Sequence, residues 1–202
     1  MREVELKAVV DDVDERRKRI EDAGAKLDYE GKLLDRRYDI ESRELASRDE
    51  VLRVRRYEDG ESVRTYLDWK GATEIQDVYK TREEISTRVD DFEALEIILE
   101  RLGFIATLEI DREVAQYALA GAMIRFERYP RMDVLVEVEG EPDAIEQAIE
   151  ALGMARGEFT SERLPIFVER FEHRTGVRAA ICDGELRGDY RFREAGGGRR
   201  EA

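Results

Sequence analysis

Strict alternation of charged and apolar side chains recurs along this chain and limits what it can fold into. In the stretch 3–7, Glu3, Glu5 and Lys7 alternate with Val4 and Leu6. Further segments alternate in the same way at 50–58, 62–70, 78–86 and 132–140. Because successive side chains of an extended strand point to opposite faces, each segment is predicted to form a strand with one charged and one apolar face. The repetition favours a large antiparallel sheet.

Amphipathic segments between and after these strands are predicted to form helices. The predicted helices occupy residues 12–23, 91–102, 142–152 and 161–171. Aspartate pairs stand at the start of the first two and Pro142 opens the third, as expected at helix N-termini. Each segment has a single apolar stripe, so the helices are expected to cover the apolar faces of the sheet. An α+β fold follows, with an antiparallel sheet closed or nearly closed on itself and helices packed outside.

The composition excludes several classes of protein. The 202 residues carry a formal net charge of -14, whereas a general nucleic-acid binder needs a basic footprint. Cys182 is the single cysteine, which excludes an intrachain disulfide and favours a cytoplasmic location. The N-terminus has no apolar region typical of a signal peptide, and no apolar run approaches the roughly 20 residues of a membrane span. His173 is the single histidine, which argues against histidine-based catalysis and histidine-rich zinc sites.

The charged faces carry acids at the two ends of the series and bases between them. The acids form two Glu-x-Glu pairs, Glu3 with Glu5 and Glu137 with Glu139. Carboxylate oxygens are the ligands that Mg²⁺ and Mn²⁺ prefer. The bases between them are Lys7, Arg53, Arg55, Lys70 and Arg82. A basic clamp beside carboxylate-bound metal is what phosphoryl transfer requires, since charge on several phosphate oxygens must be neutralised. The alternative is a half-exposed sheet on which these charges form cross-strand salt-bridge ladders in water.

Glu3-x-Glu5-x-Lys7 resembles the Glu-x-Glu-x-Lys signature of the CYTH superfamily, the triphosphate tunnel metalloenzymes. That superfamily includes class IV adenylate cyclases, thiamine triphosphatases and inorganic triphosphatases. The likeness spans roughly residues 1–172 and continues in order through Tyr38-Asp39, Leu52-Arg53-Val54-Arg55, Trp69-Lys70-Gly71, Arg82-Glu83-Glu84 and Val136-Glu137-Val138-Glu139.

The resemblance implies an eight-stranded antiparallel closed β-barrel that forms a polar tunnel for a triphosphate. It implies metal ligands for Mg²⁺ or Mn²⁺ at Glu3, Glu5, Glu84, Glu137 and Glu139. It implies phosphate-binding roles for Lys7, Arg53, Arg55, Lys70, Arg82, Arg112 and Arg125. Catalytic roles would fall to Lys7, Glu5 and Arg55. A homodimer is also an expectation from the resemblance.

One strand departs from the family's pattern. The family usually carries a Lys-x-Arg pair where this chain reads Ile110-Asp111-Arg112, so Arg112 stands for the arginine but Ile110 replaces the lysine. The family's aspartate on the following strand appears as Glu127, beside Arg125 and Arg128. The basic clamp is therefore expected to be a charge or two short.

Three functions are consistent with these residues. The first is a metal-dependent enzyme that hydrolyses a small triphosphate, such as ATP, thiamine triphosphate or tripolyphosphate, and releases phosphate. The second is a class IV adenylate cyclase that makes cyclic AMP and pyrophosphate from ATP. The third is a non-catalytic binder of nucleotides or polyphosphate. In each case residues 1–175 are expected to form the tunnel domain, and residues 176–202 a partly disordered extension.

Overall fold

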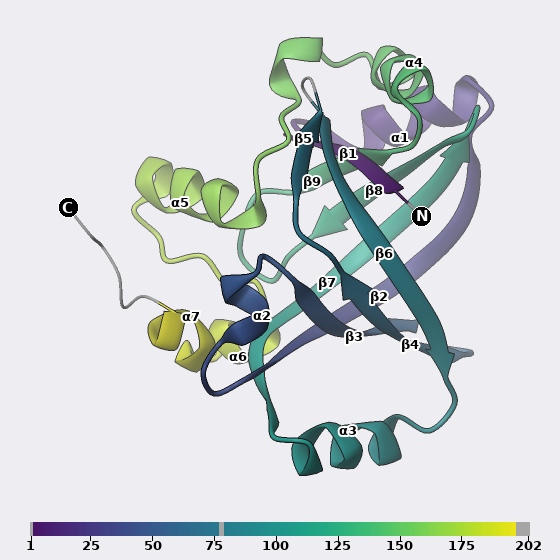
Figure 1. Ribbon diagram of the computed structural model, residues 1–202. Coiled ribbons are helices and arrows are strands. Elements are labelled where there is room, and N and C mark those ends of the chain that lie inside the picture. Colours follow the sequence, from purple (N-terminus) through teal and green to yellow (C-terminus); the bar gives the residue numbers. More distant parts are fainter. Residues whose placement is uncertain (1, 77–78, 197–202) are drawn as a thin grey trace.

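The structure, a computed structural model, describes residues 2–76 and 79–196, and the side chains of residues 5–74 and 81–193. In this part of the chain, nine strands form one antiparallel sheet in the order β1-β9-β8-β7-β2-β3-β4-β6-β5. Their bounds are β1 Arg2–Val9, β2 Lys26–Ile40, β3 Val51–Glu58, β4 Val63–Lys70, β5 Glu74–Gln76, β6 Tyr79–Val89, β7 Phe104–Leu119, β8 Ala122–Arg128 and β9 Leu135–Glu139. The predicted antiparallel α+β fold is confirmed (Figure 1).

The eight longer strands curl round until β1 meets β6, but they do not close along the whole seam. The residues of β1 from Glu5 to Val9 pair with β9, and those from Arg2 to Glu5 pair with β6. Beyond Glu5, the outer edge of β1 bonds to Thr160 instead, with Lys7 N donating to Thr160 O at 2.8 Å. The predicted closed barrel is therefore wrong: the curled sheet stays open along part of the seam between β1 and β6. The reason is that β1 is short and that only its first residues, Arg2 to Glu5, pair with β6.

Helices surround the curled sheet, as predicted. Their bounds are α1 Val13–Asp22, α2 Glu44–Ser47, α3 Phe92–Arg101, α4 Pro142–Leu152, η1 Arg156–Glu158, α5 Leu164–Thr175, α6 Asp183–Leu186 and α7 Arg191–Gly196. Asp12 caps α1 by accepting from Glu15 N, and Asp91 caps α3 by accepting from Ala94 N. Gly153 ends α4 in the left-handed conformation, where a side chain is disfavoured.

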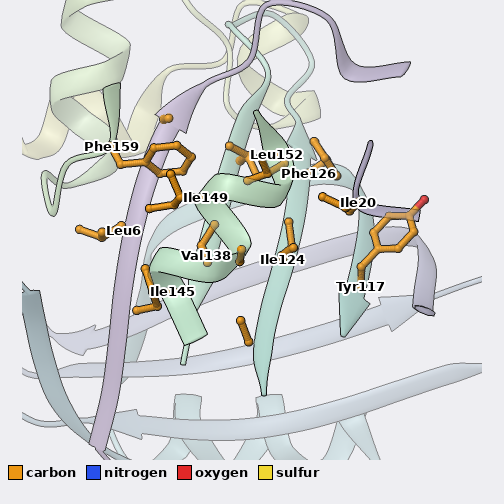
Figure 2. Close-up of a cluster of buried hydrophobic side chains, with 14 of the residues drawn as sticks. Leu6, Ile20, Tyr117, Ile124, Phe126, Val138, Ile145, Ile149, Leu152 and Phe159 are labelled. Atoms are coloured by element: carbon orange, nitrogen blue, oxygen red, sulfur yellow. The ribbon is translucent and has the colours of Figure 1, made fainter. Parts of the chain in front are cut away.

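The largest apolar cluster lies between α4 and the outer face of the sheet (Figure 2). Leu6, Ile124 and Val138 come from three neighbouring strands, and Ile145 and Ile149 come from α4. All five side chains are buried. Burying a side chain of this size contributes roughly 1.5–3 kcal/mol, so this cluster fixes α4 against the sheet and leaves the opposite strand faces for the charged residues.

The other helices pack at separate places around the sheet (Figure 1). Leu99 of α3 packs with Val54 and Tyr38, whereas Ile98 and Leu102 at the same helix end are exposed. The apolar stripe predicted for this helix is therefore only partly buried. Residues 176–193 follow α5 and return to the sheet, where Ile181 O accepts from Asp111 N at 2.9 Å.

Candidate active site

The charged faces of the strands turn to the inside of the curled sheet, where their side chains are buried. Buried charged residues at these alternating positions are Glu5, Asp35, Arg53, Asp68, Arg82, Arg112, Arg125, Glu127 and Glu137. Each of the eight longer strands contributes at least one of them. Salt-bridge ladders in water would leave such side chains exposed, so that alternative is wrong for these rows.

Lys7 lies between two carboxylates at one side of this interior. Its Nζ is 2.6 Å from Glu137 Oε2 and 3.1 Å from Glu5 Oε2. Burial alone would lower the pKa of Lys7, but Glu137 and Glu5 outweigh burial and raise the pKa above its ordinary value. Burial would likewise raise the pKa of Glu137, but Lys7 and Arg125 hold it well below its ordinary value. Lys7 and Glu137 are therefore both charged at neutral pH.

Arg125 links this acidic side to the neighbouring strand β7. Its Nη1 donates to Glu137 Oε1 at 3.1 Å, and its Nη2 donates to Gln116 Oε1 at 2.9 Å. Arg125 and Gln116 are also direct partners in the pairing of β8 with β7. The guanidinium is thereby held in one orientation inside the sheet, at a position where sequence analysis predicted a phosphate ligand.

Asp35 of β2 is the centre of a second group, in which three arginines surround one carboxylate. Arg55 binds it through two bonds, Nε to Oδ1 at 2.7 Å and Nη2 to Oδ2 at 2.9 Å. Arg112 Nη1 donates to Asp35 Oδ2 at 3.1 Å, and Arg53 Nη1 lies 3.8 Å from the same oxygen. Burial alone would raise the pKa of Asp35, but the arginines, Arg55 first, hold it well below its ordinary value.

Further carboxylates hold the outer ends of these arginines. Arg53 Nη2 donates to Asp68 Oδ2 at 2.6 Å, and Ser86 Oγ donates to Asp68 Oδ1 at 2.6 Å. On the opposite side, Arg112 Nε donates to Glu127 Oε1 at 2.7 Å. The second oxygen of Glu127 accepts from Tyr129 Oη at 2.7 Å. The inner charges therefore form a network in which acids fix the positions of the bases.

The remaining predicted residues lie along β4 and β6. Lys70 Nζ contacts Glu84 Oε1 directly across the β4–β6 pairing. Arg82 Nε donates to the carbonyl oxygen of Gly71 at 2.7 Å, and its Nη2 donates to the carbonyl oxygen of Asp49. These bonds direct the Arg82 guanidinium toward the backbone of two connecting segments, one before β3 and one after β4. Lys70 and Glu84, in contrast, form a compact acid–base pair on the inner face.

Residues 1–155 match the CYTH domain family model. The chain belongs to the CYTH family. Among solved structures, the PH1819 protein of Pyrococcus horikoshii OT3 is similar, with 25% sequence identity over 83% of this chain and 99% of that chain and a TM-score of 0.66. No curated protein matches the sequence.

Two other similar structures carry descriptions of activity. One is a candidate adenylate cyclase from Vibrio parahaemolyticus, 15% identical over 83% of this chain and 97% of that chain, with a TM-score of 0.70. The other is a candidate adenylyl cyclase from Hippeastrum with a dominant triphosphatase activity, 14% identical over 84% of this chain and 95% of that chain, with a TM-score of 0.57. At this identity the likeness shows a shared fold. None of the described helices is long and apolar enough to cross a membrane.

One end of the interior of this CYTH domain is filled by apolar side chains. Ile110 and Leu135 come from β7 and β9, Tyr129 directly follows β8, and Phe167 and Val168 come from α5. All of them are buried. Ile110 replaces the lysine of the family's pattern, and it packs in this apolar cluster. The substitution is explained by this packing, since a lysine ammonium there would be taken out of water among apolar groups.

Three of the acids predicted to bind metal, Glu5, Glu137 and Glu139, lie at the side where Lys7 stands, whereas Glu84 pairs with Lys70. Glu5 and Glu139 are direct partners in the β1–β9 pairing, as are Lys7 and Glu137. The side chain of Glu3 lies outside the described residues. Among the side chains that are described, no three acidic, histidine or cysteine residues already converge as a metal site. Like charges on directly opposed strand residues repel each other, and a cation bound between them would relieve that repulsion. The carboxylates of Glu5 and Glu139 offer the oxygen donors that a hard divalent cation prefers.

The carboxylates that organise the bases were not predicted from the sequence. Asp35, Asp68 and Glu127 were not assigned as partners of the arginines, although each is buried against one. Their two-residue spacing could have revealed them: Asp35 and Arg37 are two residues apart along β2 and so share one face, as Arg53 and Arg55 do along β3. Arg37 was also missed.

Proposed function

We propose that this CYTH domain binds a small triphosphate inside the curled sheet and hydrolyses it, releasing phosphate, with Mg²⁺ or Mn²⁺ as cofactor. The observation that carries the proposal is that five buried or nearly buried bases from four strands surround one interior, next to carboxylates. These bases are Lys7, Arg53, Arg55, Arg112 and Arg125. In a low-dielectric interior, such fixed charges stabilise the charge that develops on phosphate oxygens during phosphoryl transfer.

The residues suggest a division of work across the interior. The arginine group around Asp35 would hold the phosphate oxygens, since a guanidinium fork matches their geometry. Lys7 would serve as a point charge for a phosphate next to the acids. Glu5, Glu137 and Glu139, with Glu3, would hold the divalent cation, which supplies charge neutralisation and an acidified water when it is bound. Glu5 would orient or deprotonate the attacking water.

Two properties favour an interior site over the surface. The protein carries a net charge of -14, so most of its surface repels a polyanion. A surface hollow beside the β3–β4 turn is lined by four glutamates and one lysine and does not suit a triphosphate either; these residues are Glu30, Glu58, Glu61, Glu113 and Lys32.

The second candidate function is a class IV adenylate cyclase, favoured by the fold likeness to the candidate cyclase from Vibrio parahaemolyticus. In that reaction the ribose 3′-oxygen of ATP would attack the α-phosphorus, form the cyclic phosphodiester and expel pyrophosphate. A non-catalytic binder is the candidate from another class. It would use the same bases without turnover.

Product analysis tests these candidates. The purified protein is incubated with Mg²⁺ or Mn²⁺ and with tripolyphosphate, thiamine triphosphate or ATP, and all products are separated by chromatography. We expect orthophosphate release, which is lost in Glu5→Gln and in EDTA but retained in Glu100→Gln, a matched change on the exposed face of α3.

The alternatives give different products. Cyclic AMP with pyrophosphate would replace the hydrolase with the cyclase. Ligand-induced thermal stabilisation without any product would reduce the proposal to a binding protein. The absence of both product and ligand-induced stabilisation would refute a triphosphate site altogether.

A further inference from the structure

Arg37 of β2 is an arginine of the interior that belongs to none of the predicted roles. It lies two residues after Asp35 on the same strand, and it is the direct partner of Arg53 in the β2–β3 pairing. Directly opposed residues of an antiparallel pair project to the same face. Arg37 therefore shares the inner face with Asp35 and Arg53.

The guanidinium of Arg37 differs from those around it in its bonding. Its Nε is buried and has no hydrogen-bond partner among the described residues. Arg53, by contrast, donates from Nε and Nη2 to Asp68, and Arg55 donates from the same two atoms to Asp35. A buried donor without a partner is unfavourable, since water that it bonded in the unfolded chain has not been replaced.

The charges around Arg37 are mainly of its own sign. Burial, followed by the repulsion from Arg53, lowers the pKa of Arg37 to about 10, and Arg82 and Arg112 contribute in the same direction. Asp35 opposes them. This aspartate is already bonded twice by Arg55 and once by Arg112. The four arginines of this group, Arg37, Arg53, Arg55 and Arg112, therefore share three acids, Asp35, Asp68 and Glu127, which leaves one positive charge in excess.

We propose that Arg37 is a further anion-binding residue, whose guanidinium donates to a phosphate group of the substrate held beside Arg53 and Arg112. The proposal rests on the proposed function and adds a phosphate contact to it. A phosphate has the required chemistry, because its oxygens accept from a buried guanidinium and supply the negative charge that the group lacks. The contact lies on the arginine side of the interior, so it concerns phosphate binding.

The test compares Arg37→Gln with Arg36→Gln, the same change at the adjacent residue of the same strand. Arg36 is a matched control because it points to the other face and is already paired, with Asp111 at 2.7 Å and Glu109 at 3.3 Å. Each variant is measured in two ways: by thermal unfolding without ligand, and by calorimetric titration with tripolyphosphate in EDTA, where metal-dependent turnover is prevented.

The two arginines should respond in opposite ways. Arg37→Gln removes an unbalanced charge, so we expect unchanged or raised thermal stability without ligand and at least tenfold weaker binding of tripolyphosphate. Arg37→Lys, which keeps the charge but loses the fork, should bind with intermediate affinity. Arg36→Gln breaks two ion pairs, so it should lower the melting temperature and leave the affinity unchanged.

The outcomes separate this inference from the function on which it rests. If Arg37→Gln binds tripolyphosphate as tightly as the wild type does, the proposed role of Arg37 is wrong, but the triphosphate site remains supported. A lowered melting temperature with unchanged affinity would assign Arg37 a structural role instead. Failure of the wild type itself to bind tripolyphosphate, both in EDTA and in a repeat titration with Mg²⁺, would overturn both proposals.

Discussion

Replacing Asp35 with asparagine tests whether the buried carboxylates hold the interior together. The side chain keeps its size, but its charge is lost beside Arg55, Arg112 and Arg53, of which the first two donate hydrogen bonds to it. At an effective dielectric constant of about 20, one charge pair at 4 Å is worth about 4 kcal/mol before desolvation. Removing one partner of a buried ion pair typically costs about 3–5 kcal/mol, because the other partner is left uncompensated. We expect Asp35→Asn to lower the free energy of unfolding by about that amount.

Urea unfolding at pH 7 measures this loss, and Asp11→Asn provides a matched control. Asp11 binds Arg16 with the same two-bond geometry, Nε to Oδ1 at 2.9 Å and Nη2 to Oδ2 at 2.7 Å, but on the surface. Solvent screens that pair, so its loss should barely move the unfolding midpoint. Tripolyphosphate should stabilise Asp35→Asn more than it stabilises the wild type, because a phosphate can replace the missing negative charge.

Two results would refute this reasoning. Equal losses in Asp35→Asn and Asp11→Asn would mean that the interior is as well solvated as the surface. A large loss that tripolyphosphate does not reverse would mean that the arginines around Asp35 are closed to anions, and that they serve the fold alone.

Three further predictions concern acid stability, the apolar end and the cysteine. The folded protein lowers the pKa of Glu137, so the stabilising contribution of this carboxylate is complete above its unfolded-state pKa near 4 and is lost as the pH falls toward its folded-state pKa. Urea unfolding between pH 7 and pH 2 should therefore show the free energy of unfolding fall by up to roughly 1.4 kcal/mol per pH unit below about pH 5. Phe167→Ala should lower the free energy of unfolding by about 3–5 kcal/mol through the cavity left between α5 and the strands, whereas His173→Ala on the exposed face of α5 should change little in the same assay. Burial raises the pKa of the Cys182 thiol, so a thiol reagent at pH 8 should modify it only at the rate of unfolding, and rapid modification of the native protein would contradict the packing.

The strands and their faces were predictable because they depend on local chemistry. Alternation with period two assigned Glu5 and Lys7 to one face and Leu6 to the other, and the structure buries both faces, one among charges and one against α4. The helix starts at Asp12 and Asp91 were predictable for the same reason, since a capping side chain bonds the backbone three residues away.

The open seam between β1 and β6 and the apolar cluster at one end of the interior could not be predicted from local chemistry. Both depend on contacts between residues far apart in the sequence: Thr160 bonds to Lys7, and Phe167 packs with Ile110. From the sequence alone, Ile110 counts only as the loss of a positive charge. Its neighbours in space, which the sequence does not reveal, make it part of an apolar cluster.

The acids inside the sheet explain how an acidic protein can carry a site for a polyanion. Arg55 and Arg112 share Asp35, and Lys7 is held by Glu137, so these bases are positioned before any ligand arrives. Positioned charges lose little freedom on binding, which favours both affinity and phosphoryl transfer. The same acids also compete with phosphate for the bases. A triphosphate must therefore outweigh the internal carboxylates. We infer that the unbalanced charge of Arg37 makes this exchange favourable, and that a cation at Glu5 and Glu139 strengthens it further.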